Sequence, residues 1–145
     1  MPEVRVRKLE ADQPAAWDEA LASSATFTAL DPWSHLVRQT YGYAVHRFEA
    51  IQDNEVTGIL VLTHVRHPIF GNYLTTSPFG SYGGFAFATE EARNALLETA
   101  RKLSDDLRVD YCVLRFLDDS AAPPSPWVQH QIYATYFIDL PKDAE

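Results

Sequence analysis

His64 and His67 are the pair whose spacing first suggests a metal site, because imidazoles are the commonest metal ligands in proteins. If both belong to one strand, the odd spacing of three residues puts the two rings on opposite faces of the sheet. His67 also precedes Pro68, which favours a place in a turn. The spacing therefore predicts no metal site, and His35 is expected to be exposed rather than catalytic.

Nucleophilic side chains are present, but none has the sequence context of an enzyme nucleophile. Ser34, Ser77 and Ser81 lie outside any G-x-S-x-G turn, and no Ser-His-Asp arrangement is indicated. Cys112, the single cysteine, lies in an apolar run, which predicts a buried, inert thiol and excludes an internal disulfide. Two carboxylate pairs are expected to be solvated ends of elements: Asp105-Asp106 and Asp118-Asp119. We assign no catalytic residue.

The glycine-rich segment Pro78–Gly84 is the remaining place where a ligand could approach the backbone. It lacks the G-K-[ST] ending of a P-loop and the G-x-G-x-x-G spacing of a dinucleotide site. It also lacks the R/Q-x-x-G-x-G/A loop with which acetyltransferases bind the coenzyme A pyrophosphate. Two interpretations stay open. The segment is a structural turn, or it is a substrate-facing loop in which Ser81 and Tyr82 supply hydroxyls and Gly83 and Gly84 let a ligand or second domain come close.

Local capping signals predict three helices around these residues. The first opens at Asp12-Gln13-Pro14 and carries Trp17 and Leu21 on one face. The second has Asp31 as N-cap, Pro32 in its first turn and Gly42 as C-cap. Thr89 caps the third, whose apolar stripe has spacings of three and four residues: Ala92, Leu96, Ala100, Leu103 and Leu107.

Alternating and continuous apolar runs predict the strands. A short edge strand over Val4–Leu9 comes first. Val45–Ile51, Val56–Val65 and Tyr73–Thr76 form an antiparallel meander, of which Val56–Val65 is apolar on both faces and therefore central. Val109–Leu117 is predicted as a further central strand. After a loop over Ser120–Pro126, Ile132–Leu140 is predicted as the last strand.

Length and composition describe one globular domain over residues 1–145. Hydrophobic residues are 46%, aromatics 12% and charged residues 22%, and the net charge is -8. No basic face is visible, so we expect no direct nucleic-acid binding. Met1–Arg5 has no apolar signal-peptide segment, and the apolar runs are far shorter than the ~20 residues that span a bilayer. These observations predict a cytoplasmic protein without a transmembrane segment.

A series of short motifs runs through essentially the whole chain. The motifs are Phe27-Thr28, Asp31-Pro32-Trp33, Thr40–Tyr43, Gly58–Leu62, Pro68–Asn72, Ser77-Pro78-Phe79, Ser81–Gly84, Asp110–Arg115 and Tyr136–Pro141. In this order they resemble the N-terminal half of FemAB-type proteins. That family comprises peptidoglycan-bridge aminoacyltransferases and their relatives in exopolysaccharide and exosortase systems.

The resemblance implies an α+β, α/β/α-layered fold. Family members contain two acetyltransferase-like (GNAT-like) domains, each with a mixed, largely antiparallel twisted sheet and helices on both faces. This chain corresponds to the first domain, and the resemblance predicts that a basic helical segment and a second GNAT-like domain follow near Glu145. The partner expected first is therefore that missing C-terminal domain.

The function that the resemblance implies is acyl or aminoacyl transfer to a small-molecule or lipid-linked precursor of peptidoglycan or exopolysaccharide. The donor would be acyl-CoA or aminoacyl-tRNA, no bound cofactor is expected, and the isolated chain would be inactive. We expect substrate contact at Ser81, Tyr82, Gly83 and Gly84, with Arg38 or Arg66 as partner of an anionic group. Two alternatives stay open: a stand-alone acyl-CoA-dependent N-acetyltransferase, and a non-catalytic interaction module that forms a homodimer.

Overall fold

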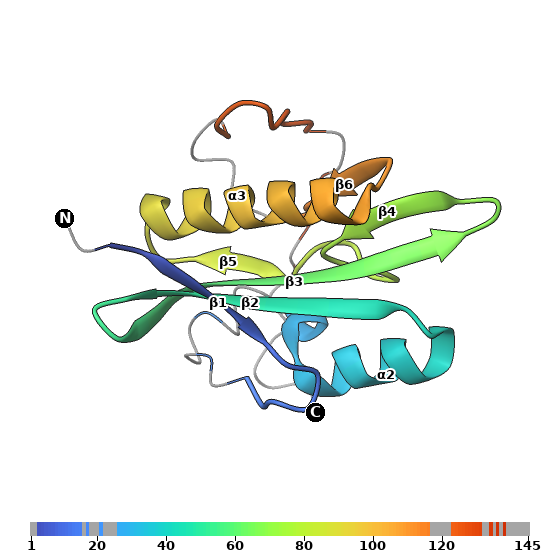
Figure 1. The fold of residues 1–145 in the computed structure, drawn as a ribbon, viewed down its shortest axis with the longest axis horizontal. Helices are drawn as coiled ribbons and strands as arrows, with labels where there is room; N and C mark the ends of the chain where they lie inside the picture. The colour runs from blue at the N-terminus through green and yellow to red at the C-terminus, as the bar shows by residue number, and fades with distance from the viewer. Residues whose placement is uncertain are drawn as a thin grey trace.

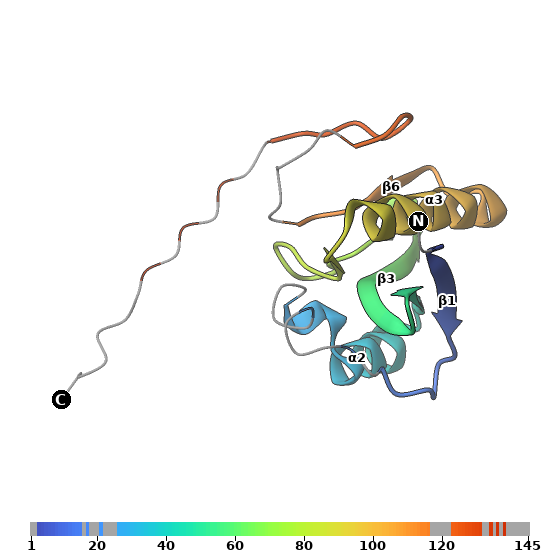
Figure 2. The same ribbon diagram turned by 90° about the vertical axis from the view of Figure 1, so that its left-hand side faces the viewer.

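The computed structural model describes residues 3–15, 17, 21, 26–116, 123–131, 134, 136 and 138. A mixed, twisted sheet lies between two helices, as Figures 1 and 2 show. The elements are, in chain order, β1 (Arg5–Leu9), the 3₁₀ turn η1 (Phe27–Ala29), α2 (Asp31–Tyr41), β2 (Ala44–Gln52), β3 (Glu55–His67), β4 (Gly71–Thr75), β5 (Phe85–Phe87), α3 (Glu90–Leu107) and β6 (Tyr111–Val113).

The sheet is largely antiparallel, as predicted. Its strand order is β1-β2-β3-β4-β6. Strand β5 pairs with residues 58–60 of β3, and β4 pairs with residues 63–67 of the same strand. Among the described strands only β4 and β6 pair in parallel, because the long connection through β5 and α3 brings the chain back in the same direction. The meander of β2, β3 and β4 and the edge position of β1 are confirmed.

Strand β3 is buried on both faces, which confirms its central place. Leu60 and Leu62 pack under α3 together with Leu96. Ile59 and Val61 belong to a second cluster on the opposite face, with Leu21 and Ala29.

Helix α3 follows its capping and periodicity signals. The Thr89 hydroxyl accepts a hydrogen bond from the Ala92 amide at 3.1 Å. Ala92, Leu96 and Ala100 are buried, and Leu103 and Leu107 are half-buried at the end of the same stripe. Local signals therefore gave this helix correctly, because its cap and its buried face depend on short spacings.

At α2 the Gly42 C-cap is confirmed, but the predicted role of Asp31 is wrong. Gly42 is left-handed and its amide donates to the Arg38 carbonyl. Asp31 is already helical, and its carboxylate makes no capping bond. It accepts instead from the Ala15 amide at 3.0 Å and from the guanidinium of Arg47. A buried cation needs a counter-charge more than an exposed helix end needs a cap, because water can solvate that end.

The remaining sequence predictions are corrected or fall outside the described residues. Of the strand predicted over Val109–Leu117, the described residues 109–116 are strand only at Tyr111–Val113, and β6 ends the sheet of the described residues rather than lying centrally. Strand β5 was not predicted. The first helix falls mainly on undescribed residues, although Pro14 and Ala15 are not helical. Of Ile132–Leu140 only Ala134, Tyr136 and Ile138 are described; they belong to no strand, and all three are exposed. Among the described residues no helix is long and apolar enough to cross a bilayer.

Candidate functional site

Residues 76–84 leave the sheet between β4 and β5 and form a loop at its centre, called here the 76–84 loop. Thr75 is the last residue of β4 paired with β3, and Phe85 is the first residue of β5 paired with it. On β3 only Val61 and Leu62 separate their partners. The glycine-rich segment predicted as a loop is thus a long insertion opposite two residues of a central strand.

The base of the 76–84 loop is fixed to the chain at and after β6. The Thr76 amide donates to the Val113 carbonyl at 3.2 Å, and the Gly83 amide donates to the Arg115 carbonyl at 2.8 Å. The Arg115 amide in turn donates to the Thr76 hydroxyl at 2.9 Å. Because these bonds join both ends of the loop to one short segment, the loop has a defined shape.

Gly83 and Gly84 belong to this base and are buried. Gly84 has φ of 71°, and a side chain there would overlap the carbonyl oxygen of Thr76. Its own carbonyl accepts from the Val61 amide at 2.7 Å. Of the two interpretations left open above, the structural turn describes the geometry of these glycines, because the backbone that packs closely against Gly84 belongs to Thr76 and Val61 of this chain.

The outer part of the 76–84 loop packs against η1 and α2. The Thr26 hydroxyl donates to the Tyr82 carbonyl at 3.2 Å, and Gly80 lies close to Phe27 and Thr28. The Phe79 ring stacks on Tyr41 of α2 with centroids 4.4 Å apart. Ser81 is exposed and the Tyr82 side chain is half-buried, so these two predicted contacts face or approach solvent.

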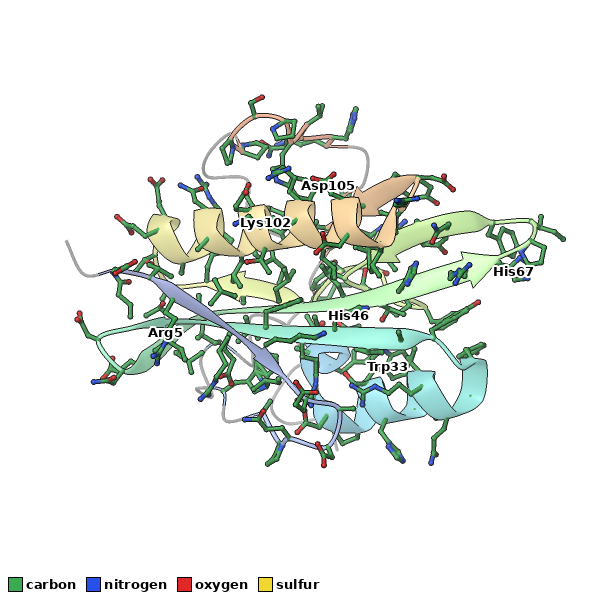
Figure 3. The ribbon with its side chains drawn as sticks, in the orientation of Figure 1. Arg5, Trp33, His46, His67, Lys102 and Asp105 are labelled. Carbon is green, nitrogen blue, oxygen red and sulfur yellow. The ribbon has the colours of Figure 1, made fainter. Side chains whose placement is uncertain are left out.

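Exposed aromatic side chains surround the 76–84 loop. Phe27, Tyr41 and Phe79 are each about half-exposed. Phe27 meets Trp33 edge-on at 4.9 Å, and Figure 3 shows Trp33 on α2. We call these four side chains the aromatic face. Clustered, half-exposed aromatic side chains make this surface a candidate binding site.

A second ring pair extends this surface toward the edge of the sheet. Tyr73 of β4 and Tyr111 of β6 stack in parallel with centroids 4.9 Å apart. Burial raises the pKa of Tyr73, the neighbouring hydroxyls of Tyr111 and Tyr43 raise it further, and the charge of Arg115 opposes the rise. Arg115 therefore lies within electrostatic reach of Tyr73, while its carbonyl holds Gly83.

The structure does not bring Arg38 and Arg66 together. Arg38 lies on α2 and donates to the carbonyls of Ala11 and Val45. Burial, and then the charge of Arg47, lower the pKa of Arg38, while Asp31 opposes that change. Arg66 is exposed near the end of β3 on the face of Leu62, which α3 covers. The two cations thus lie on opposite faces of the sheet.

Arg115 is the cation that sequence reasoning missed at the 76–84 loop. The sequence placed it inside a strand predicted to be apolar on both faces, where a charged residue is out of pattern. That mismatch was the available signal that the strand stops early.

His64 and His67 each have a local hydrogen-bond partner. His64 and His67 both belong to β3 on opposite faces, as their spacing predicted, and His67 is the last residue of that strand rather than part of the turn that Pro68 suggested. His64 Nε2 lies 2.6 Å from Asn72 Oδ1. His67 Nδ1 accepts hydrogen bonds from the amides of Ile69 and Phe70. His35 is exposed, as expected.

The nucleophile candidates are not activated. Ser34 and Ser77 are buried, and their hydroxyls have no hydrogen-bond partner among the described residues. Burial raises the pKa of the half-buried Cys112 thiol to about 11, despite a hydrogen bond with Ser104 that lowers it. At neutral pH the thiolate population is therefore negligible, as expected of an inert cysteine. Asp105 pairs with Arg101 at 2.7 Å, and Asp118-Asp119 lies outside the described residues.

Comparison with solved structures identifies the fold. The chain is similar to the ribosomal-protein-alanine N-acetyltransferase from Brucella melitensis biovar Abortus 2308, with a TM-score of 0.56 over 95% of this chain and 99% of that chain at 13% identity. A probable acetyltransferase gives a TM-score of 0.44 at 13% identity, over 96% of this chain and 99% of its own. No protein-family model and no curated protein matches the chain. The fold is a GNAT-like α+β fold, as predicted.

Proposed function

We propose that this chain is the N-terminal GNAT-like domain of a FemAB-type acyl or aminoacyl transferase acting on a peptidoglycan or exopolysaccharide precursor. The GNAT-like fold and the ordered series of motifs support this proposal. The observation that carries it is the 76–84 loop, whose base is hydrogen-bonded to Val113 and Arg115 and whose Phe79 stacks on Tyr41 of the aromatic face. The second domain of the same protein is the proposed partner.

The domain's role in this proposal is to bind the acceptor rather than to attack the donor. Acyl transfer from a thioester or aminoacyl ester to an amine needs the two substrates held together and the developing charge stabilised. A covalent enzyme intermediate is not needed, which is consistent with the high pKa of Cys112, about 11. Ser81 and Tyr82 would contact the acceptor, and Arg115 would pair with an anionic group of it. Because Arg38 and Arg66 lie on opposite faces of the sheet, each of them would pair only with a different part of the substrate. Gly83 and Gly84 would hold the loop.

Calorimetric titration of this chain tests the proposal. A soluble peptidoglycan precursor, a sugar nucleotide carrying a peptide, is expected to bind, whereas acetyl-CoA produces no heat. Ser81→Ala combined with Tyr82→Ala should weaken precursor binding about fivefold, the effect of losing a hydrogen bond or two. The control Glu55→Ala, at the exposed first residue of β3, should bind as the parent does. Absence of precursor binding, or equal binding by the double variant, would overturn the proposal.

One observation favours a second candidate, a stand-alone N-acetyltransferase. This chain covers 99% of the Brucella acetyltransferase, so a single domain of this size can match a whole acetyltransferase chain. Binding of acetyl-CoA without binding of the precursor would select this second candidate.

A further inference from the structure

The turn between β3 and β4 exposes the two most accessible large apolar side chains of residues 26–116. Ile69 is 82% exposed and Phe70 is 67% exposed. We call residues 66–70 the hairpin tip. Adjacent large apolar residues at an exposed turn cost solubility, so their presence calls for a partner.

The hairpin tip extends beyond the rest of the sheet. Strand β2 begins at Ala44, whose partner on β3 is His64, so Val65–His67 have no β2 neighbour. Figure 1 shows the β3–β4 hairpin reaching past the ends of α2 and α3, and Figure 3 places His67 at its end. The exposed Ile69 and Phe70 lie outside the shallow hollow that Arg66, His67, Pro68, Gly71, Asn72 and Asp110 line.

The backbone of the hairpin tip has no unsatisfied N–H group at residues 68–70. Pro68 has no N–H. The amides of Ile69 and Phe70 donate to His67 Nδ1 at 3.1 and 3.3 Å. The rings of His67 and Phe70 also pack with centroids 4.7 Å apart, which orders the turn. An exposed turn can leave such amides to water, but a turn that enters an apolar medium must satisfy them internally.

Charge does not oppose contact at this end of the molecule. Arg66 immediately precedes His67, and Arg108 and Asp110 both contact Asn72. At the end of α3, Asp105 is paired with Arg101, and Asp106 is exposed. Part of the acidic surplus lies at the opposite end: Asp53 in the β2–β3 turn, Glu55 at the start of β3, and Glu90 and Glu91 at the start of α3 (Figure 1). At physiological salt, charges so far from a surface are screened.

We propose that the hairpin tip docks on a lipid bilayer. Ile69 and Phe70 enter the interfacial region, and Arg66 stays at the level of the lipid phosphates. The internally satisfied amides favour lipid over a protein partner, because a protein pocket can supply its own acceptors. Two side chains give weak, reversible binding, so this contact orients the protein on a membrane rather than anchoring it.

Vesicle flotation with the whole chain tests this inference. Vesicles of phosphatidylcholine mixed with phosphatidylglycerol should carry a measurable bound fraction. Ile69→Ser combined with Phe70→Ser should lower the partition coefficient about tenfold. The matched control Val128→Ser, at a residue 72% exposed elsewhere, should leave the coefficient unchanged. Thermal unfolding of each variant verifies that it folds.

Two further variants separate the parts of the proposal. His67→Phe keeps an aromatic ring beside Phe70 but removes the acceptor of two amide hydrogen bonds. It should therefore weaken binding to vesicles both with and without phosphatidylglycerol. Arg66→Glu should weaken binding only where phosphatidylglycerol is present. Failure of the parent protein to bind vesicles, or equal binding by the double serine variant, would overturn the inference. The assay involves no acyl transfer, so such a failure leaves the proposed function standing.

Discussion

Arg47 in the interior of β2 forms an ion pair with Asp31 in the first turn of α2. The same guanidinium donates to the carbonyls of Glu10 and Gln13, both at 2.6 Å. One buried cation therefore connects the sheet, the segment after β1 and the start of α2. Because α2 also presents Tyr41 to Phe79, this connection helps to place the aromatic face beside the 76–84 loop.

Removing the carboxylate should destabilise the fold. Asp31→Ala leaves the Arg47 guanidinium buried without its counter-charge, and we expect a loss of about 2 kcal/mol in the free energy of unfolding. Urea denaturation measures it. Asp31→Leu with Arg47→Met should recover part of the loss, because no buried charge remains. Asp106→Ala, at an exposed carboxylate, serves as control, and a single variant as stable as this control would contradict the prediction.

Two left-handed glycines provide a matched pair for the 76–84 loop. Gly42 and Gly84 have φ of 68° and 71°, but a Cβ at Gly42 meets nothing within 4 Å, whereas one at Gly84 overlaps the Thr76 carbonyl. Gly42→Ala should cost about 1 kcal/mol from backbone strain alone. Gly84→Ala should cost at least about 3 kcal/mol, since strain and overlap add. Equal losses in denaturant titrations would contradict the prediction, because they would show that the base of the loop shifts to accept the new Cβ at little cost.

Stability should depend on pH through His46. Burial above all, with Lys8, His64 and Arg38 nearby, lowers the folded pKa of His46 from 6.5 to about 4. Between these values the unfolded chain binds the proton more readily, so stability present above pH 6.5 is lost as pH falls toward 4.

Melting temperatures across this range test the contribution. His46→Leu should flatten the decline relative to the parent, whereas His35→Gln, at an exposed histidine, should not. The comparison between variants removes the effect of carboxylates that titrate in the same range. Parallel curves for the parent and His46→Leu would rule the contribution out.

The Cys112 thiol should react slowly in the folded protein. Its pKa of about 11 leaves little thiolate at pH 8, while an unfolded cysteine near 8.5 is partly ionised. Alkylation followed by mass spectrometry should therefore be at least about a hundredfold slower in buffer than in urea, because access is restricted as well. Comparable rates in both solutions would contradict the burial of this side chain.

Sequence signals of short range predicted much of this fold. The Thr89 cap, the stripe of α3 and the two-faced apolar run of β3 depend only on neighbouring residues. Strand β5 was not predicted because three residues are too few to establish a hydrophobic period. Asp31 was misassigned because its partner Arg47 lies 16 residues away, and no local pattern shows which residue a carboxylate will meet.

The candidate site was predictable only in part, for a related reason. The glycines marked a loop at Pro78–Gly84, but not that the loop closes on Arg115. Arg38 and Arg66 were grouped by charge, while helix position and strand alternation put them on different faces. Register across the sheet decides such groupings, and a single sequence does not carry register directly.

The attachment of the 76–84 loop to Val113 and Arg115 also sets an order of events during synthesis. A growing chain that has not yet exposed residue 115 outside the ribosome lacks both acceptors of the Thr76 and Gly83 amides. The meander and α3 can assemble earlier, since their contacts are already present in the emerged segment. The surface around Ser81 and Tyr82 is therefore completed late, when β6 docks beside β4.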